Sequence, residues 1–124
     1  MRVWISAVLA SAALASGYGL KAAAPAKGYV IAEISVRDPE AYKSYAAAVA
    51  PIVARFGGTY LVRGGETRSR EGAPVAGRIV VIEFPSHAAA AAFYDSADYQ
   101  AILPLRQGAA DSRVFSVEGH APTP

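Results

Sequence analysis

The order of strand-like and helix-like segments most restricts how this 124-residue chain can fold. Runs of β-branched and aromatic residues predict strands, and apolar residues spaced three and four apart after a capping residue predict helices. Strands are expected at Tyr29–Val36, Thr59–Arg63, Arg78–Phe84 and Ser112–Glu118. A helix capped by Asp38 follows the first strand and ends at Gly57-Gly58, a second runs from the cap Ser86 through Tyr94, and Ser96 can cap a further short one. The order is therefore strand, helix, strand, strand, helical region, strand.

This βαββαβ order predicts an α+β, ferredoxin-like fold, in which one four-stranded antiparallel sheet carries its helices on one face. Gly64–Gly77 is polar and rich in glycine, which is typical of a long surface loop between two strands. Two prolines lie inside helical segments. Pro51 is expected to kink or split the first helix, and Pro104 is expected to interrupt or end the last one, because proline lacks a backbone N–H.

The first residues have the pattern of a cleavable secretory signal. A positive start, an apolar stretch and small residues of the A-x-A kind follow one another: Met1-Arg2, Val3–Ala15, and Ala22, Ala24 and Ala26. The alternative is an uncleaved membrane anchor, since Val3–Leu20 is nearly long enough to span a bilayer, although its alanine, serine and glycine make it weakly apolar. We expect a signal peptide at 1–26, a folded domain at 27–119 and a flexible tail at 120–124. The expected location is periplasmic or secreted, with no stable membrane insertion after signal removal.

Composition excludes several classes of function. Arg2 and Lys21 fall in the signal, so ten basic residues face ten acidic ones from Lys27 onward, and no basic surface for nucleic acid is expected. The absence of cysteine excludes disulfides, thiolate metal sites and a cysteine nucleophile. Because His87 and His120 are the two histidines, we expect no metal site and assign no cofactor.

Side chains alternate between the two faces of a strand, so the faces can be separated in sequence. In the first and third strands one set is purely apolar and is expected beneath the helices: Val30, Ala32, Ile34, Val36, Val80, Ile82 and Phe84. The other set mixes apolar residues with two carboxylates: Tyr29, Ile31, Glu33, Ser35, Ile79, Val81 and Glu83. Such a face is too apolar to stay in water. It predicts a second sheet stacked on it, most simply from an identical subunit, with a partly polar cavity between.

Glu33 and Glu83 are the candidate catalytic residues, as a carboxylate pair of which one member has a raised pKa and acts as acid or base. The alternative is that each forms an ion pair, for instance with Arg63 or Arg78, or reaches solvent. The candidate ligand-binding residues are Tyr29, Arg63, Tyr94, Tyr99 and Arg106. Of these, Tyr94, Tyr99 and Arg106 can line a pocket mouth with hydroxyl and guanidinium donors, or can serve in helix packing with a polar tip.

Several short segments together resemble a bacterial family, the domain of unknown function numbered 1330. The segments are Asp38-Pro39-Glu40-Ala41-Tyr42, Gly57-Gly58, Tyr60–Gly65, Val81–Ser86, Tyr94-Asp95-Ser96, Tyr99–Ile102 and Leu105-Arg106. They span nearly all of 28–119. The resemblance implies the dimeric α/β-barrel superfamily, in which two ferredoxin-like subunits place their sheets face to face. Its members include cofactor-free monooxygenases, isomerases, dehalogenating and haem-degrading enzymes, and proteins of no known activity, so the fold does not decide the chemistry.

Two hypotheses for the function follow. The first is an exported homodimer that binds a small, partly apolar organic molecule, with cofactor-free acid–base chemistry by Glu83 or Glu33. The second is a non-catalytic dimeric scaffold or interaction module, whose carboxylates set only pairing and register. Whether the chain is an enzyme stays open between them.

Overall fold

The structure, a computed structural model, describes residues 24–123. Four strands and three helices follow the predicted order: β1 (Gly28–Val36), α2 (Pro39–Arg55), β2 (Thr59–Arg63), β3 (Arg78–Phe84), α3 (His87–Asp95), α4 (Ala97–Ala109) and β4 (Ala110–Glu118). Residues 1–23 of the predicted signal lie outside the described residues. None of the helices within 24–123 is both long and apolar enough to cross a membrane.

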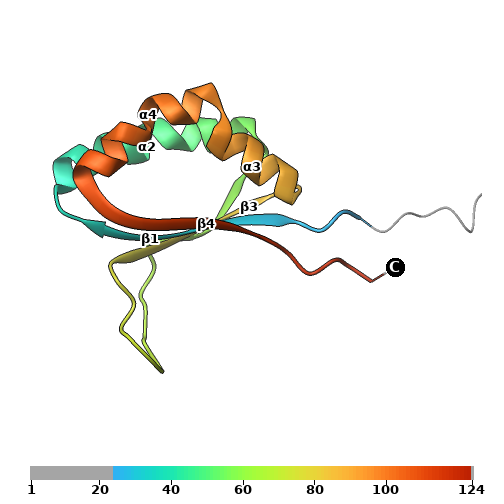
Figure 1. The fold of residues 1–124 in the computed structure, drawn as a ribbon, viewed down its shortest axis with the longest axis horizontal. Coiled ribbons are helices and arrows are strands. Elements are labelled where there is room, and N and C mark those ends of the chain that lie inside the picture. Colours follow the sequence, from blue (N-terminus) through green and yellow to red (C-terminus); the bar gives the residue numbers. More distant parts are fainter. Residues whose placement is uncertain (1–23, 124) are drawn as a thin grey trace, which may run out of the picture.

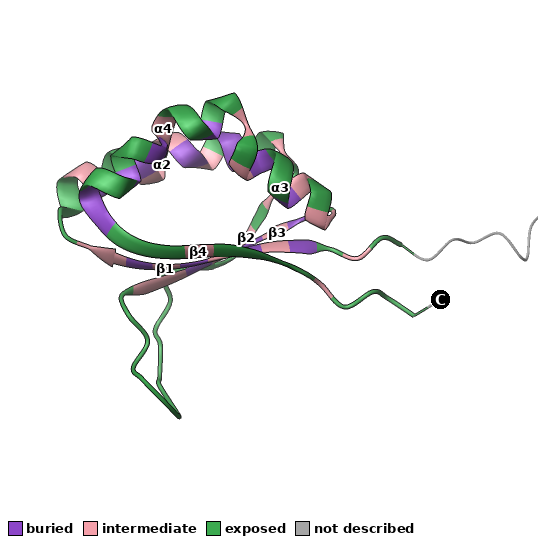
Figure 2. Ribbon diagram, in the orientation of Figure 1, coloured by how far each residue is buried: buried purple, intermediate pink, exposed green. Residues whose placement is uncertain are grey.

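The strands form one antiparallel sheet in the order β2-β3-β1-β4, and all three helices cover the same face of it (Figure 1). This confirms the predicted ferredoxin-like α+β fold. The 64–77 segment between β2 and β3 is exposed throughout and projects from the side without helices (Figures 1 and 2). The sheet therefore has a covered face beneath the helices and an uncovered face opposite.

Side-chain caps begin the helices where the sequence indicates. The side chains of Asp38, Ser86 and Ser96 accept hydrogen bonds from the backbone N–H groups three residues later, at 3.2, 3.0 and 3.1 Å. The two internal prolines do not divide the helices: α2 runs through Pro51 and α4 continues past Pro104. Both prolines are exposed, so each helix loses a backbone bond on its solvent side while its buried side still packs.

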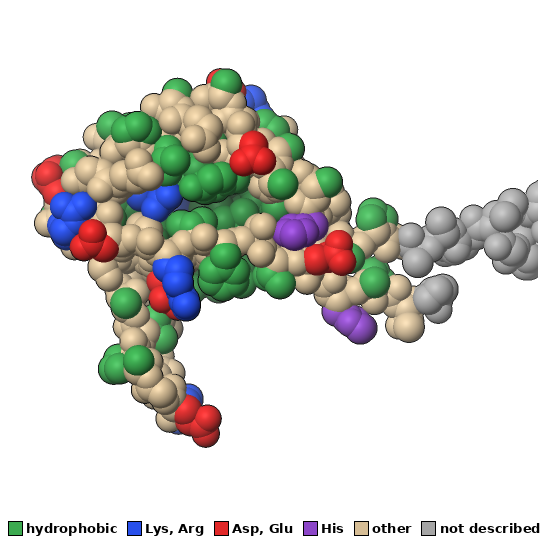
Figure 3. Space-filling view, viewed as in Figure 1, with side chains coloured by type: hydrophobic (Ala, Val, Ile, Leu, Met, Phe, Trp, Pro, Cys, Tyr) green, Lys and Arg blue, Asp and Glu red, His purple; other side chains and the backbone are tan. Residues whose placement is uncertain are grey.

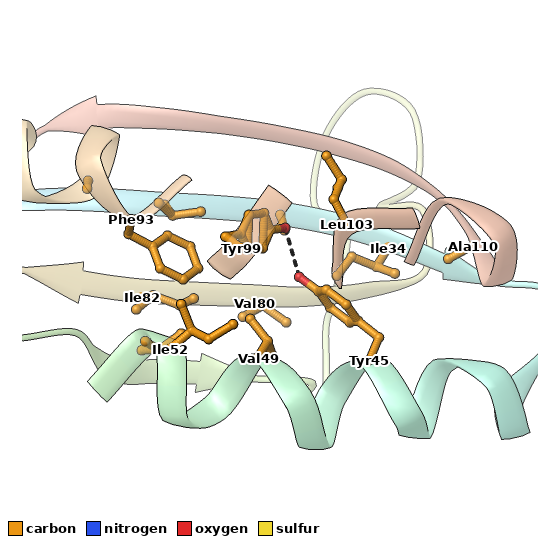
Figure 4. Packing of buried hydrophobic residues seen from close by; sticks show 14 of the residues in the cluster. Ile34, Tyr45, Val49, Ile52, Val80, Ile82, Phe93, Tyr99, Leu103 and Ala110 are labelled. Carbon is orange, nitrogen blue, oxygen red and sulfur yellow. Dashed lines mark hydrogen bonds between the residues drawn. The ribbon is translucent and has the colours of Figure 1, made fainter. Parts of the chain in front are cut away.

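The core lies between the covered face and the helices, where Ile34, Val80 and Ile82 face Val49 and Phe93 (Figure 4). Phe84 and Phe93 are fully buried, with ring centroids 5.1 Å apart. The residues predicted to lie beneath the helices are buried, apart from the half-buried Val36, whereas their neighbours Ile31, Ile79 and Val81 are only half-buried. The division of β1 and β3 into two faces is thus confirmed.

Candidate functional site

A cavity lies between the helices and the covered face of the sheet. Side chains from α2, α3 and α4 and from all four strands line it: Val30, Ala32, Ile34, Tyr42, Tyr45, Ala46, Val49, Tyr60, Arg63, Arg78, Val80, Ile82, Phe93, Tyr99, Arg106 and Val114. Its interior leaves about 40 Å³ in which the centre of a water-sized sphere fits, which is room for a few small atoms. This cavity is on the opposite side of the sheet from the pocket predicted between two stacked sheets, which needs a second subunit and stays a prediction.

Two more open hollows adjoin this cavity along β4. The smaller hollow has a volume of about 280 Å³, measured in the same way as the cavity, and shares the lining residues Val30 and Val114 with it. The larger hollow has a volume of about 440 Å³ and shares Arg106 and Val114 with the cavity. Figure 3 shows a hollow between the helical layer and β4, with hydrophobic side chains at its back and a Lys or Arg side chain at one end. A molecule can therefore reach the interior past the edge strand β4.

Two tyrosines meet at the helix side of the cavity. Tyr45 on α2 and Tyr99 on α4 point toward each other, and their hydroxyl oxygens are 2.9 Å apart (Figure 4). Burial raises the pKa of Tyr45, and Tyr99 raises it further, so the Tyr45 hydroxyl keeps its proton. Their mutual bond uses one of two hydroxyl hydrogens. The other hydrogen is available to an acceptor in the cavity.

Arg106 on α4 is the most deeply buried cation of the described chain, with 5% of its surface exposed. Its guanidinium lies 5.9 Å from the ring centroid of Tyr45, and its Nε has no acceptor among the described residues. Burial lowers the pKa of Arg106, but the hydroxyl groups of Tyr99, Tyr45 and Tyr94 together raise it above its ordinary value, so the group stays charged. The cavity thus holds a permanent cation with an unsatisfied N–H.

Arg78 at the start of β3 is held between a glycine and a ring. Its guanidinium lies 5.3 Å from the Tyr42 ring centroid, and its Nε is buried without an acceptor among the described residues. Gly64 has φ 72°, and a Cβ there would lie 2.7 Å from Nη2 of Arg78. Glycine at this position therefore serves both the left-handed backbone and the place of the guanidinium.

Arg63 on β2 reaches the same cavity because of a β-bulge. The register of β2 against β3 shifts between Tyr60 and Val62, so that Tyr60 pairs with Ile82 and Arg63 with Val80. Ile82 and Val80 both lie on the covered face, so Tyr60 and Arg63 lie there too, although the two residues between them would put them on opposite faces of a regular strand. Arg63 lies 4.4 Å over the Tyr60 ring and its Nη2 donates to the carbonyl of Ala46 at 3.4 Å.

The cavity lining contains three arginines and no carboxylate. Ion pairs among residues 24–123 use other cations: Arg37, Lys43, Arg55, Arg68 and Arg113. Burial raises the pKa of Tyr42, and the positive charges of Arg78, Arg106 and Arg63 lower it in part. Tyr60 Oη is also buried without a partner among the described residues. Chemically, this is a set of donors for an oxygen anion inside an apolar shell.

Sequence comparison identifies the family to which this fold and site belong. Residues 27–120 match the family described as "Domain of unknown function (DUF1330)". The chain belongs to the DUF1330 family. No curated protein matches its sequence.

Solved structures resemble this DUF1330 chain in fold. RPA0582, a protein of unknown function from Rhodopseudomonas palustris, has a TM-score of 0.62 at 21% identity, over 93% of this chain and 97% of that one. SnoaB from Streptomyces nogalater, a cofactor-independent oxygenase, has a TM-score of 0.55 at 15% identity, over 80% and 98%. A dimeric ferredoxin-like protein of unknown function from Thermobifida fusca has a TM-score of 0.54 at 14% identity, over 79% and 95%. At these identities the likeness is one of fold alone.

The predicted ligand-binding residues of this DUF1330 chain lie in three places. Arg63, Tyr99 and Arg106 line the cavity, and Tyr94 lines both adjoining hollows. Tyr29 is on the uncovered face, where its hydroxyl donates to Glu83 Oε2 at 3.2 Å. Burial and this hydrogen bond raise the pKa of Tyr29.

The structure does not bring Glu33 and Glu83 together within one subunit. Glu33 is opposite Ile79 in the β1–β3 register and Glu83 is opposite Tyr29, four residues further along, or about 13 Å along the strand direction. Glu33 instead forms an ion pair with Arg113 of β4, at 2.8 Å. The hypothesis that the two carboxylates form a pair in one subunit is wrong, and so are Arg63 and Arg78 as their partners.

Sequence analysis did not select Tyr42, Tyr45, Tyr60 or Arg78 as site residues, although a signal existed for two of them. Arg78 lies two residues before Val80 and four before Ile82 on the same strand, so strand alternation places it on the covered face with them. Tyr45 belongs to the apolar stripe of α2, and a hydroxyl on a buried stripe needs a partner. For Tyr60 the sequence carries no signal, because the bulge that places it is not marked by a glycine or proline.

Proposed function

We propose that this DUF1330 domain binds a small, partly apolar organic molecule in the cavity between its helices and its sheet, as a subunit of an exported homodimer. One observation carries the binding function: a cavity among close-packed core residues whose wall includes the unpartnered Tyr60 Oη and a buried tyrosine pair. Protein cores are filled and their buried polar groups are hydrogen-bonded. A cavity with unsatisfied donors is therefore the best candidate for a binding site.

The comparisons support a small-molecule site on this scaffold without giving a reaction. SnoaB has a similar fold and is a cofactor-independent oxygenase. Acid–base chemistry by Glu33 or Glu83 is not part of the proposed site, because both side chains are on the uncovered face while the cavity is on the covered one. A role for these carboxylates stays a prediction about the uncovered face.

The uncovered face supports the homodimer. Its central residues Ile31 and Val81 are directly opposite each other and only half-buried, and Phe115 on β4 is 44% exposed. Apolar side chains in adjacent strands form a continuous surface that water disfavours. A second copy presenting the same surface covers both at once. The dimeric ferredoxin-like structure from Thermobifida fusca is consistent with such pairing.

Export rests on the pattern of the first 26 residues, and the family match begins directly after them, at residue 27. Full-length protein made in a bacterial host should be found in the periplasm, trimmed to begin within a few residues of Lys27. Intact-mass measurement of the periplasmic and membrane fractions tests this. A membrane-bound species that still carries Met1 would identify the segment as an anchor.

Ligand binding is tested by titrating the ¹⁵N-labelled protein with a library of neutral and charged aromatic and lactone-like compounds. The amide signals of Val49, Val80 and Tyr99 should shift, because these residues line the cavity from α2, β3 and α4. Shifts at Ile31 and Val81 instead would place the site on the uncovered face. No binding by any compound would favour the non-catalytic dimeric scaffold.

A further inference from the structure

We propose that the ligand of this cavity is a small carboxylic acid with an apolar body, and that Arg106 and Arg78, with the Tyr45–Tyr99 hydroxyl pair, bind its carboxylate. This inference rests on the proposed ligand-binding function and specifies the ligand class.

The positive charge of the cavity has no counter-charge among the described residues. Three guanidinium groups line one cavity, and neither a carboxylate lining it nor an ion pair among residues 24–123 compensates them. A buried charge without a partner is strongly unfavourable, so buried cations in proteins are paired with anions. The missing partner for Arg106, which is 5% exposed, is an anion that the chain itself does not supply.

The polar groups of the cavity also have hydrogen-bond donors without acceptors. Tyrosine rings lie beneath the guanidinium groups of Arg106 and Arg78, at 5.9 and 5.3 Å, and stabilise their positive charge. A ring face does not satisfy in-plane N–H donors, and the buried Nε atoms of both arginines have no acceptor among the described residues. Tyr45 and Tyr99 have one hydroxyl hydrogen left between them. All of these groups donate, so the ligand atom that they meet must accept.

Space selects the carboxylate and its apolar body. The centre of a water molecule can occupy about 40 Å³ inside the cavity, which leaves room for a group of a few atoms. The hollow beside it, of about 280 Å³, is lined mainly by apolar side chains, among them Val30, Ala90 and Val114. A planar carboxylate fits a guanidinium through two parallel N–H···O bonds. An aromatic or alkyl body attached to it fits the hollow along β4.

The exposure of the three arginines increases toward the edge of the sheet. Arg106 is buried, Arg78 is half-buried and Arg63, on the edge strand β2, is exposed. Cations that line a cleft attract anions and raise their local concentration. Arg63, on the edge of the sheet opposite β4, thus adds positive potential to the cavity from the side away from the hollows, while the two inner arginines hold the bound carboxylate.

Isothermal titration with matched acid and amide probes tests the proposal on the purified protein. Benzoate is compared with benzamide, and 3-phenylpropionate with 3-phenylpropionamide, because each pair differs in charge but hardly in shape. At least one acid should bind tenfold or more tightly than its amide. Arg106→Met should remove that preference, whereas Arg68→Met, in the exposed 64–77 segment, removes the same charge and should leave it unchanged.

A thermal unfolding experiment separates a binding role of Arg106 from a structural one. Without ligand, Arg106→Met should unfold at the temperature of the wild type or above it, because it removes an unpaired buried cation and keeps a side chain of similar length. With the acid, the wild type should gain stability and the variant should not. If Arg106→Met does not fold, Arg106 is structural and the proposal fails, unless Arg78→Met folds and removes the acid preference.

The outcomes distinguish this inference from the proposed function. Equal binding of acids and amides, or binding of neutral library compounds together with no binding of either acid, overturns the carboxylate and leaves the cavity as a ligand site. Failure of every library compound and every probe to bind overturns both.

Discussion

The two faces of this sheet carry different kinds of polar group. On the covered side the charged groups of the cavity are arginines without ion-pair partners among the described residues: Arg63 and Arg78 from the sheet and Arg106 from α4. On the uncovered face the carboxylates are satisfied within the subunit, Glu33 by Arg113 and Glu83 by the hydroxyl of Tyr29. Unsatisfied donors collect on one face and satisfied acceptors on the other.

This difference suits the two faces of the sheet to the two proposed tasks, assembly and ligand binding. Glu33 and Glu83 each have a hydrogen-bond partner within the subunit, so a second copy can cover the uncovered face without leaving either carboxylate without a partner. A cavity whose donors lack acceptors is suited to a ligand that supplies them. The proposed assembly therefore belongs to the uncovered face, and the proposed ligand binding to the covered face.

The largest expected difference between the faces concerns stability. Phe84→Ala should lower the free energy of unfolding by about 3–5 kcal/mol, because Phe84 is fully buried against Phe93 and its loss leaves a cavity. Phe115→Ala, on the uncovered face, is the matched control and should cost far less in the dissociated subunit. Urea unfolding at several protein concentrations measures both. A larger loss for Phe115 at low concentration would contradict the assignment of the core to the covered face.

The next effect concerns assembly. Wild type should be a dimer at micromolar concentration, and replacing both Ile31 and Val81 with Lys should weaken the dimer at least about 100-fold, because like charges then face each other across the interface. Leu105→Lys replaces an exposed apolar residue on the helix side and should leave the dimer intact. Sedimentation velocity measures the three proteins. A monomeric wild type would leave the apolar uncovered face without an explanation.

How far the sequence predicts these faces depends on the strand. Alternation assigns β1 and β3 correctly, because both are regular and their apolar sets are unbroken. It fails for β2, where the bulge between Tyr60 and Val62 places Tyr60 and Arg63 on one face. The position of a bulge depends on how a strand pairs with its neighbour, and the residues of β2 alone do not indicate that pairing.

Alternation also predicts a face but not a position along it. Glu33 and Glu83 share the uncovered face as expected, yet the register separates them by four residues. β1 and β3 are not joined by a hairpin turn that would set their register, so packing decides it. Likewise, the effect of Pro51 and Pro104 depends on which side of each helix is buried. Both helices continue through their prolines because tertiary packing stabilises the buried side.

A smaller effect should appear at high pH. Burial raises the pKa of Tyr45 above its ordinary value, so the unfolded chain releases this proton near pH 10 while the folded protein keeps it. The stabilisation is complete below pH 10 and is lost as the pH rises above it, by at most about 1.4 kcal/mol per pH unit for one tyrosine. Urea unfolding between pH 9 and 12 should therefore show a shallower decline for Tyr45→Phe than for wild type. Parallel declines would show that Tyr45 ionises alike in both states.

The smallest expected effect compares one tyrosine hydroxyl from each face. Tyr45→Phe removes the buried bond to Tyr99 and leaves the Tyr99 hydroxyl without that partner, so at pH 7 it should lower the free energy of unfolding by about 1 kcal/mol. Tyr29→Phe removes the bond to Glu83 on the half-exposed face, where water can replace it, and should change stability little. Urea unfolding below the dimer dissociation concentration keeps assembly out of the measurement. If Tyr29→Phe proved the more destabilising, the uncovered face would depend on its own polar contacts before any second copy binds, and the division of tasks between the faces would be wrong.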